Sequence, residues 1–234
     1  MQRWRKAFRL YKYLFDYGNL LSVPLVRAVA QVKAGHPVAS GVRRFLIVGH
    51  RASTSPTFSL DDLAGAAGRM DILLHSANSV LLLAHDIRRD AEAALLLLGP
   101  PDPPRLVRML GHRLRAYQPD VRSNAALLRN ALAHRSRVER EVSPGICASR
   151  TTFEEALDRL GPTFVYLHER GKDIRNAILP VDATFVLSDN MDLAELEEKA
   201  LIDRGALVVG VGPRVLHTDQ TVAVVQNELD RRQA

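Results

Sequence analysis

The sequence is poorest in cysteine, with a single residue, Cys147, among 234. One cysteine excludes a disulfide framework and any cysteine-based metal site, which suits a reducing cytosol. Because Cys147 lies in "PGICAS", with no motif that activates a thiol, we expect a packed and unreactive side chain. The sequence also lacks a run of about 18 apolar residues, so we expect no membrane-spanning segment.

Several catalytic motifs are missing as well. The sequence has no phosphate-binding P-loop and no serine in a nucleophile elbow. Its eight histidines show no ligand spacing, so we expect no metal. The "GVG" at 210–212 has the first two glycines of a dinucleotide fingerprint, but the third is absent and Pro213 follows. Its place near the end of the chain also argues against dinucleotide binding.

Charge and aromatic residues are unevenly distributed. Of the 32 basic and 26 acidic residues, residues 1–41 hold seven and one, which leaves 25 of each in 42–234. The aromatic residues that recur at helical spacing among these cations are Trp4, Phe8, Tyr11 and Phe15. This pattern predicts a basic amphipathic helix attached to an electrically neutral body.

Residues 1–41 allow several interpretations. Such a helix suits an RNA-gripping or membrane-surface segment, and its richness in arginine suits a transit peptide. Alternatively, the segment precedes the native start, because the linker "GHPVASG" gives way to a strand at Val42 and valine can be encoded by an alternative start codon. We expect residues 1–41 to be an extension and linker, and 42–234 to be the working domain.

Strand and helix patterns alternate from Arg44 onward. Apolar and β-branched runs predict strands at 43–50, 91–99, 145–150, 162–169, 183–189 and 206–212. Apolar residues at helical spacing predict helices at 68–87, 124–135, 151–160 and 192–205, and a further helix that closes the chain. The stretch 100–117 mixes polar and apolar residues and suits a hairpin.

Capping signals mark two helix starts. Ser123 is expected to cap the helix at 124–135. The helix at 151–160 opens with two overlapping capping-box patterns, Thr151 with Glu154 and Thr152 with Glu155.

The alternation predicts a parallel sheet covered on both faces, with ligands at the carboxyl ends of its strands. The loops "LHERGKD", "LSDNMD" and "VGPRVLHTD" fall at those ends. They carry little charge where they turn, which suits a pocket whose main-chain groups hold an adenine edge. The alternative is that Gly210 and Gly212 only permit a tight turn.

Four stretches carry a family resemblance: "RRFLIVGHRASTSPTFSLDDLAGAAGRMD", "LLLLGPPDPPRLVRMLG", "TFVYLHERGKDI" and "GPRVLHTDQTVAVVQNELDRR". Together they resemble the TrmY family of tRNA pseudouridine-54 N1-methyltransferases, within the SPOUT superfamily. The resemblance covers 43–232 in order. It implies an α/β fold with a mostly parallel sheet, helices on both faces and a C-terminal trefoil knot. It also implies a cytoplasmic homodimer that uses S-adenosyl-L-methionine to methylate tRNA.

The resemblance implies a set of cofactor-binding residues: Leu167, Ser188, Val211, Gly212, Pro213, Arg214, Val215, Leu216 and Thr221. Two of them depart from the family pattern, which has Gly at the position of Ser188 and often Cys at that of Thr221. A serine adds a hydroxyl and restricts the backbone where glycine would not, so we expect weaker cofactor binding at this position.

The same resemblance assigns the catalytic roles to Arg69 and Asp71 of "GRMD". Asp71 would accept or orient the N1 proton of pseudouridine, and Arg69 would bind phosphate or stabilise charge on the uracil carbonyl. The alternative is that the two residues only form an ion pair at a helix N-terminus. The matching residues with a weaker case for contact are Asn78, Arg88 and Asp90. Alternative functions are methylation of ribosomal RNA, and RNA binding by a cofactor-weak paralogue.

Overall fold

The computed structural model describes residues 41–233, so the predictions for residues 1–40 lie outside the described part of the chain. The strands are β1 (Arg43–Gly49), β2 (Ala91–Leu97), β3 (Arg105–Leu110), β4 (Arg140–Ser143), β5 (Ile146–Ser149), β6 (Phe164–Asp173), β7 (Thr184–Ser188) and β8 (Leu207–Gly210). The helices are α3 (Met70–Leu81), α4 (Val121–Leu132), α5 (Phe153–Leu160), α6 (Glu195–Asp203) and α7 (Thr218–Gln233), with a short 3₁₀ helix, η1 (Ile174–Asn176). In this part of the chain, none of the helices has the length and apolar character needed to cross a membrane.

The eight strands form one mixed sheet in the order β4-β5-β3-β2-β1-β7-β6-β8. The pairings of β1, β2, β7, β6 and β8 are parallel, as predicted. Those of β3, β5 and β4 are antiparallel, so the prediction of a parallel sheet is wrong for this half. The physical reason is loop length, because the chain from 98 to 104 is too short for the crossover that a parallel pair requires.

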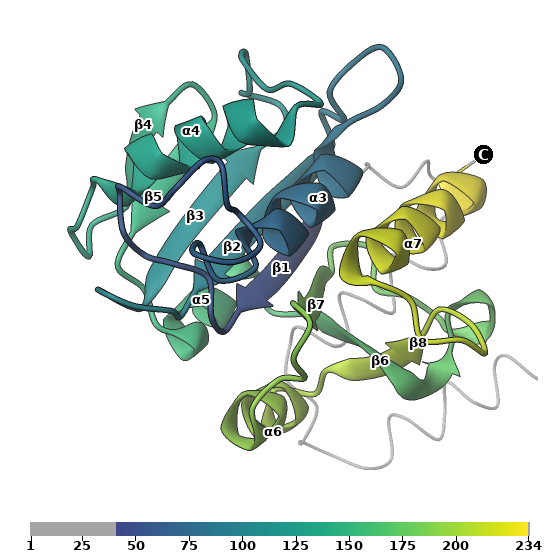
Figure 1. The fold of residues 1–234 in the computed structure, drawn as a ribbon. Helices are drawn as coiled ribbons and strands as arrows, with labels where there is room; N and C mark the ends of the chain where they lie inside the picture. The colour runs from purple at the N-terminus through teal and green to yellow at the C-terminus, as the bar shows by residue number, and fades with distance from the viewer. Residues whose placement is uncertain (1–40, 234) are drawn as a thin grey trace, which may run out of the picture. The chain divides into compact units, whose positions relative to one another are not determined.

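Helices cover both faces of the sheet (Figure 1). Phe45 and Ile47 point toward a core that includes side chains of α3, α4 and α7. Leu46 and Val48, which alternate with them along β1, point toward a second core with side chains of α5 and α6. All seven residues of β2 are buried, which explains its apolar run from Ala93 to Leu97.

The predictions of turns and helix caps were confirmed only in part. The predicted hairpin at 100–117 is wrong, because this stretch contributes a single strand, β3, that pairs with β2 and β5. Asp120 caps α4, and its side chain accepts a hydrogen bond from the backbone N–H of Ser123, so the predicted cap at Ser123 is also wrong. Of the two overlapping capping boxes, Thr152 with Glu155 forms. The polar strand β4 was not predicted.

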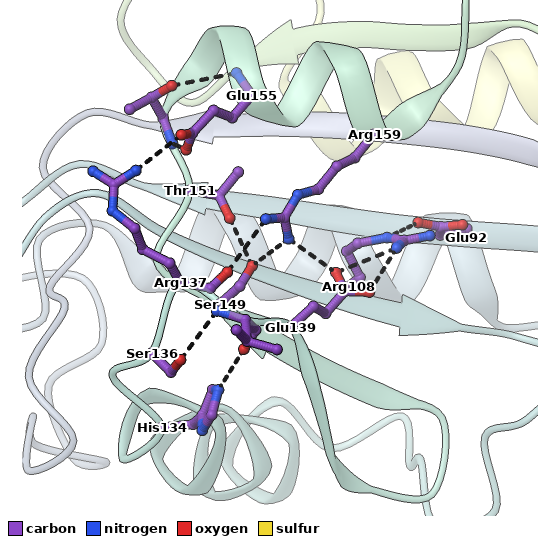
Figure 2. Close-up of polar contacts among 12 residues, drawn as sticks. Glu92, Arg108, His134, Ser136, Arg137, Glu139, Ser149, Thr151, Glu155 and Arg159 are labelled. Atoms are coloured by element: carbon purple, nitrogen blue, oxygen red, sulfur yellow. Dashed lines mark hydrogen bonds and ion pairs between the residues drawn. The ribbon is translucent and has the colours of Figure 1, made fainter.

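A network of charged and polar side chains joins β2 and β3 to α5 (Figure 2). Glu92 is only 4% exposed, and its Oε1 accepts a hydrogen bond of 2.6 Å from Nε of Arg108. Nη1 of Arg108 also donates to Glu139 at 3.0 Å. Arg159 of α5 donates from Nη1 to Oγ of Ser149 at 3.0 Å. These contacts fix α5 over the antiparallel half of the sheet.

Strand β8 pairs with two separate parts of β6. Val209 is the register partner of both Leu167 and Lys172, so the four residues between them are looped out of the pairing. The backbone of Gly171 lies so close to β8 that an added Cβ would be 2.4 Å from the carbonyl carbon of Val209. Only glycine fits at this approach.

His50, directly after β1, ties the loop after β7 to the start of α6. Its backbone N–H donates to Oδ2 of Asp189 at 2.9 Å, and its Nδ1 lies 3.5 Å from Oδ1 of the same carboxylate. Its Nε2 lies 2.9 Å from Oε2 of Glu197. The contact with Asp189, and then that with Glu197, raises the pKa of His50 from 6.5 to about 9, although burial opposes the rise. The imidazole is therefore protonated at neutral pH.

The buried pair between Glu92 and Arg108 gives a first prediction. Replacing Glu92 with Gln leaves the Arg108 charge with one carboxylate fewer in a buried setting, so the free energy of unfolding should fall by about 2–3 kcal/mol. Asp158→Asn is the matched control, because its ion pair with Arg204 is exposed and should contribute less than about 1 kcal/mol. Urea denaturation measures both. Equal losses in the two variants would contradict the assignment.

His50 gives a prediction about pH. Its folded-state pKa lies above its value in the unfolded chain, so its stabilising contribution is complete below about pH 6.5 and is lost as the pH rises through 9. The full contribution is at most about 3 kcal/mol. The wild-type free energy of unfolding, followed by urea titration, should fall between pH 6.5 and 9.5 more steeply than that of His50→Gln. Parallel pH profiles would show that the imidazolium does not stabilise the fold.

Candidate functional site

A cavity of about 550 Å³ opens at the carboxyl ends of the parallel strands. Its wall comes from the start of α3, the middle of β6, the end of β7, and the segment from the end of β8 to the first turn of α7. The buried apolar part of the wall consists of Leu167, Leu187 and Val209. The three loops that were expected to share one edge of the sheet therefore do so.

Nearly all the predicted cofactor residues line this cavity. They are Leu167, Ser188, Val211, Gly212, Arg214, Val215, Leu216 and Thr221. Pro213 is exposed and is not part of the lining. Gly212 has φ of 155°, and no other atom lies within 4 Å of where its Cβ would be. The loop is therefore open on the side where a larger residue at 212 would project.

The loop between β7 and α6 is held in place from both sides. Oγ1 of Thr218, at the start of α7, donates to the carbonyl oxygen of Ser188 at 2.8 Å. Oγ of Ser188 donates in turn to the carbonyl oxygen of Met191. Oδ1 of Asp189 accepts from the backbone N–H of Met191 at 2.9 Å. The Ser188 hydroxyl is thus used within the loop, which limits the extra bulk that it presents to a ligand.

The two predicted catalytic residues also line the cavity, at the start of α3. Nε and Nη2 of Arg69 donate to the two carboxylate oxygens of Asp71, both at 3.1 Å. The ion pair that was considered as an alternative is therefore present, and both of its residues line the cavity. Each carboxylate oxygen keeps a further lone pair for another donor.

An unusual backbone turn sets the position of this pair. Gly68 and Arg69 both have left-handed backbones, with φ of 66° and 64°. A Cβ at Gly68 would lie 1.9 Å from the carbonyl oxygen of Arg51, so only glycine fits there. For Arg69, a non-glycine residue, this conformation costs of the order of 1 kcal/mol and is typical of functional sites. The turn orients α3 so that its first residues line the cavity.

The prediction of a pocket with little charge is wrong. Besides Arg69 and Asp71, the wall contains charged side chains from all three loops: Glu169, Asp189, Asp192, Arg214 and Asp219. Asp189 is 7% exposed because its backbone N–H donates to Val48 and draws the residue against β1. Sequence patterns do not reveal such a long-range contact.

Further residues of the wall were not predicted. Tyr166 lies in the wall with its ring centroid 5.3 Å from that of His168, and burial raises the pKa of its hydroxyl to about 12. His75, four residues after Asp71, lies on the same side of α3. That helical spacing is the one sequence signal that could have indicated His75.

The three residues with the weaker case do not line the cavity. Asn78 donates to the carbonyl oxygen of Pro119, and its own side-chain oxygen accepts from Asn124. Both terminal nitrogens of Arg88 donate to Asp230 near the end of α7, at 2.8 and 2.9 Å.

Asp90 forms an ion pair of 3.1 Å with Arg43. These contacts join α3, β1 and β2 to α4 and α7, so the three residues have structural contacts outside the cavity.

Within residues 41–233, no group of three or more histidine, cysteine or acidic side chains is arranged to hold a metal ion. Cys147 is buried in β5, and burial raises the pKa of its thiol.

The chain is similar in sequence to named archaeal proteins over most of its length. The tRNA (pseudouridine(54)-N(1))-methyltransferase of Methanocella arvoryzae is 45% identical over 193 residues, which cover 82% of this chain and 100% of the relative. The protein of the same name from Methanosarcina acetivorans is 41% identical over 197 residues, covering 82% of this chain and 93% of the relative.

The fold also has a counterpart among solved structures. The crystal structure of Archaeoglobus fulgidus Nep1 bound to S-adenosylhomocysteine matches with a TM-score of 0.56 over 81% of this chain and 97% of that one, at 13% identity. At this identity the likeness concerns the fold. A family model described as "Putative SAM-dependent RNA methyltransferase" matches residues 42–234. Together with the relatives above 40% identity, this match shows that the chain belongs to that family of RNA methyltransferases.

Proposed function

We propose that this protein methylates N1 of pseudouridine at position 54 of tRNA, with S-adenosyl-L-methionine as the methyl donor. The observation that carries the proposal is the cavity of about 550 Å³ at the carboxyl ends of the parallel strands. The segments expected to hold the cofactor and the Arg69–Asp71 pair expected to meet the substrate line that same cavity. Relatives of this name match the chain over nearly their full length.

The residues present suit the cofactor. A cavity of about 550 Å³ falls within the range for a ligand of nucleoside size. The apolar side chains of Leu167, Leu187 and Val209 suit an adenine ring, and the main-chain groups of 211–216 suit its polar edge. The open side of Gly212 allows the backbone to approach the ligand closely. When bound, the cofactor supplies an electrophilic methyl group on a sulfonium.

The nucleophile is N1 of the target base, a weakly acidic N–H. We propose that Asp71 accepts the hydrogen bond from this N–H and either takes the proton or orients it. Its two hydrogen bonds with Arg69 hold the carboxylate in one position in the wall of the cavity. Positioning of the base against the methyl donor therefore supplies much of the rate. Arg69 is also placed to stabilise negative charge that develops on a uracil carbonyl.

We also propose that the C-terminal segment forms the trefoil knot of SPOUT proteins and that the enzyme works as a cytoplasmic homodimer. In support of threading, β8 pairs with residues on both sides of the loop from Leu167 to Lys172. Arg232 near the end of α7 donates to carbonyl oxygens of Ile174 and Ala177, just beyond that loop. The state of assembly is measured by light scattering on the purified protein.

The activity is tested with purified protein, S-adenosyl-L-methionine and tRNA that carries pseudouridine at position 54. Mass spectrometry of the digested nucleosides should reveal N1-methylpseudouridine, and tRNA with uridine at position 54 should remain unmodified. Methylation of ribosomal RNA in place of tRNA would redirect the proposal to that substrate. The absence both of methyl transfer and of cofactor binding would favour a cofactor-weak RNA-binding protein.

A substitution at Asp71 tests the catalytic assignment. Asp71→Asn keeps the shape and removes the carboxylate, so turnover should fall about 10²-fold or more while cofactor affinity is unchanged. Asp61→Asn, which removes an exposed carboxylate paired with Arg122, is the control and should leave turnover unchanged. Initial rates and calorimetric titration measure the two quantities. Normal turnover in Asp71→Asn would leave the residue with only its ion-pair role.

Substitutions at two loop positions test the cofactor site. Gly212→Val adds a branched side chain on the open side of the loop, so cofactor binding should be lost, as measured by isothermal titration. Gly205→Val is the control, because Gly205 has φ of 75° and open surroundings but does not line the cavity. Ser188→Gly should bind the cofactor at least as tightly as the wild type. Unaltered binding by Gly212→Val would remove 211–216 from the site.

A further inference from the structure

A second cavity, of about 900 Å³, lies near the amino end of β2, whereas the first opens at the carboxyl ends of the parallel strands. Its lining is rich in basic and polar side chains: Arg89, His112, Arg113, Arg115, Glu141 and Ser143, with Leu114, Val142 and Pro144. The position follows from strand direction. β3 runs antiparallel to β2, so the loop after Leu110 lies where β1 and β2 begin.

This cavity gathers basic side chains within residues 42–234, which have no net charge. The basic side chains of its lining are Arg89, Arg113, Arg115 and His112, and the one acidic side chain is Glu141. Arg115 and His112 are exposed, and neither has an ion-pair partner among the described residues. Arg113 is paired with Glu141 at 2.5 Å and Arg89 with Asp86 at 3.1 Å, so the guanidinium of Arg115 is the uncompensated positive charge of the cavity within the described part of the chain.

The loop that presents these cations is held in shape from within. Nη1 of Arg89 donates to the carbonyl oxygens of Gly111 and Leu114, at 3.1 and 2.8 Å. A Cβ at Gly111 would lie 2.1 Å from the carbonyl oxygen of Arg88, so the loop start is packed tightly against the chain before β2. Leu114 and Tyr117 anchor the loop in the core beneath α3 and α4. The cations are therefore carried on a preorganised loop.

Helix α3 connects the two cavities. It begins beside the Arg69–Asp71 pair and ends at Leu81, whose carbonyl oxygen accepts from the backbone N–H of Arg88, next to Arg89. Its twelve residues span about 18 Å. A nucleic acid whose target base lies in the first cavity can run along this side of the molecule and bring backbone phosphates to the second.

We infer that the second cavity binds backbone phosphates of the RNA at a distance from the nucleotide that is modified, with Arg115 and Arg113 as the main contacts. This inference rests on the proposed RNA substrate. Such contacts hold the RNA in register without reading its sequence. They also make affinity sensitive to salt, because each phosphate that is neutralised releases counterions.

The test compares two double variants of the full chain. Arg113→Gln/Arg115→Gln removes the proposed contacts, and Lys199→Gln/Arg204→Gln removes the same charge from α6 on the other face of the sheet. The first should bind tRNA about 5–10-fold more weakly and reduce the slope of log affinity against log salt by roughly 1–2. The second should match the wild type. Cofactor affinity should be equal in all three proteins.

A trinucleotide with the target base at its centre provides the second arm, because its phosphates adjoin that base and do not extend along the whole length of α3 to the second cavity. Its methylation rate should be the same in the Arg113→Gln/Arg115→Gln variant and the wild type, whereas KM for whole tRNA should rise in the variant. Salt slopes for whole tRNA that are equal in the variant and the wild type would overturn the inference. Affinity is measured apart from methyl transfer, so a protein that binds tRNA in this manner but does not methylate it would contradict the proposed function alone.

Discussion

The close approach of Gly171 to Val209 is the constraint on which the cavity depends. The backbones of β6 and β8 lie closer than a Cβ would permit, and β8 pairs with two parts of β6 on either side of a loop. That arrangement brings the middle of β6 and the segment after β8 to the same edge of the sheet as the end of β7. The walls of the cavity then come from three segments that are distant in sequence but fixed by backbone contacts.

A second constraint places the substrate side of the site. The left-handed turn at Gly68 and Arg69 is strained, and the collision that a side chain at 68 would have with Arg51 leaves little alternative. The strain fixes the direction in which α3 leaves the turn, so Arg69 and Asp71 face the segments that are proposed to hold the cofactor. Part of the stability of the fold comes from a region outside the cavity. The buried charges around Glu92 secure the antiparallel half of the sheet, away from the reaction.

The sequence could predict the features that depend on local periodicity and known motifs. The capping box of Thr152 with Glu155 and the alternation of strands and helices from α5 to α7 are of this kind. Strand direction in the antiparallel half was not predictable from periodicity, since only the short loops encode it. Asp120 and Ser123 are both good capping residues three positions apart, and only the geometry decides between them. The charge of the cavity was missed because Asp189 is drawn inward by contacts with β1, far away in sequence.

The central claim is that one cavity holds the methyl donor beside the Arg69–Asp71 pair. A crystal structure of the protein soaked with S-adenosylhomocysteine tests it most directly. We expect the ligand between the middle of β6, the end of β7 and the segment 211–216, with its sulfur on the side of Asp71. Binding elsewhere on the molecule, or in this cavity with the sulfur directed away from α3, would contradict the account.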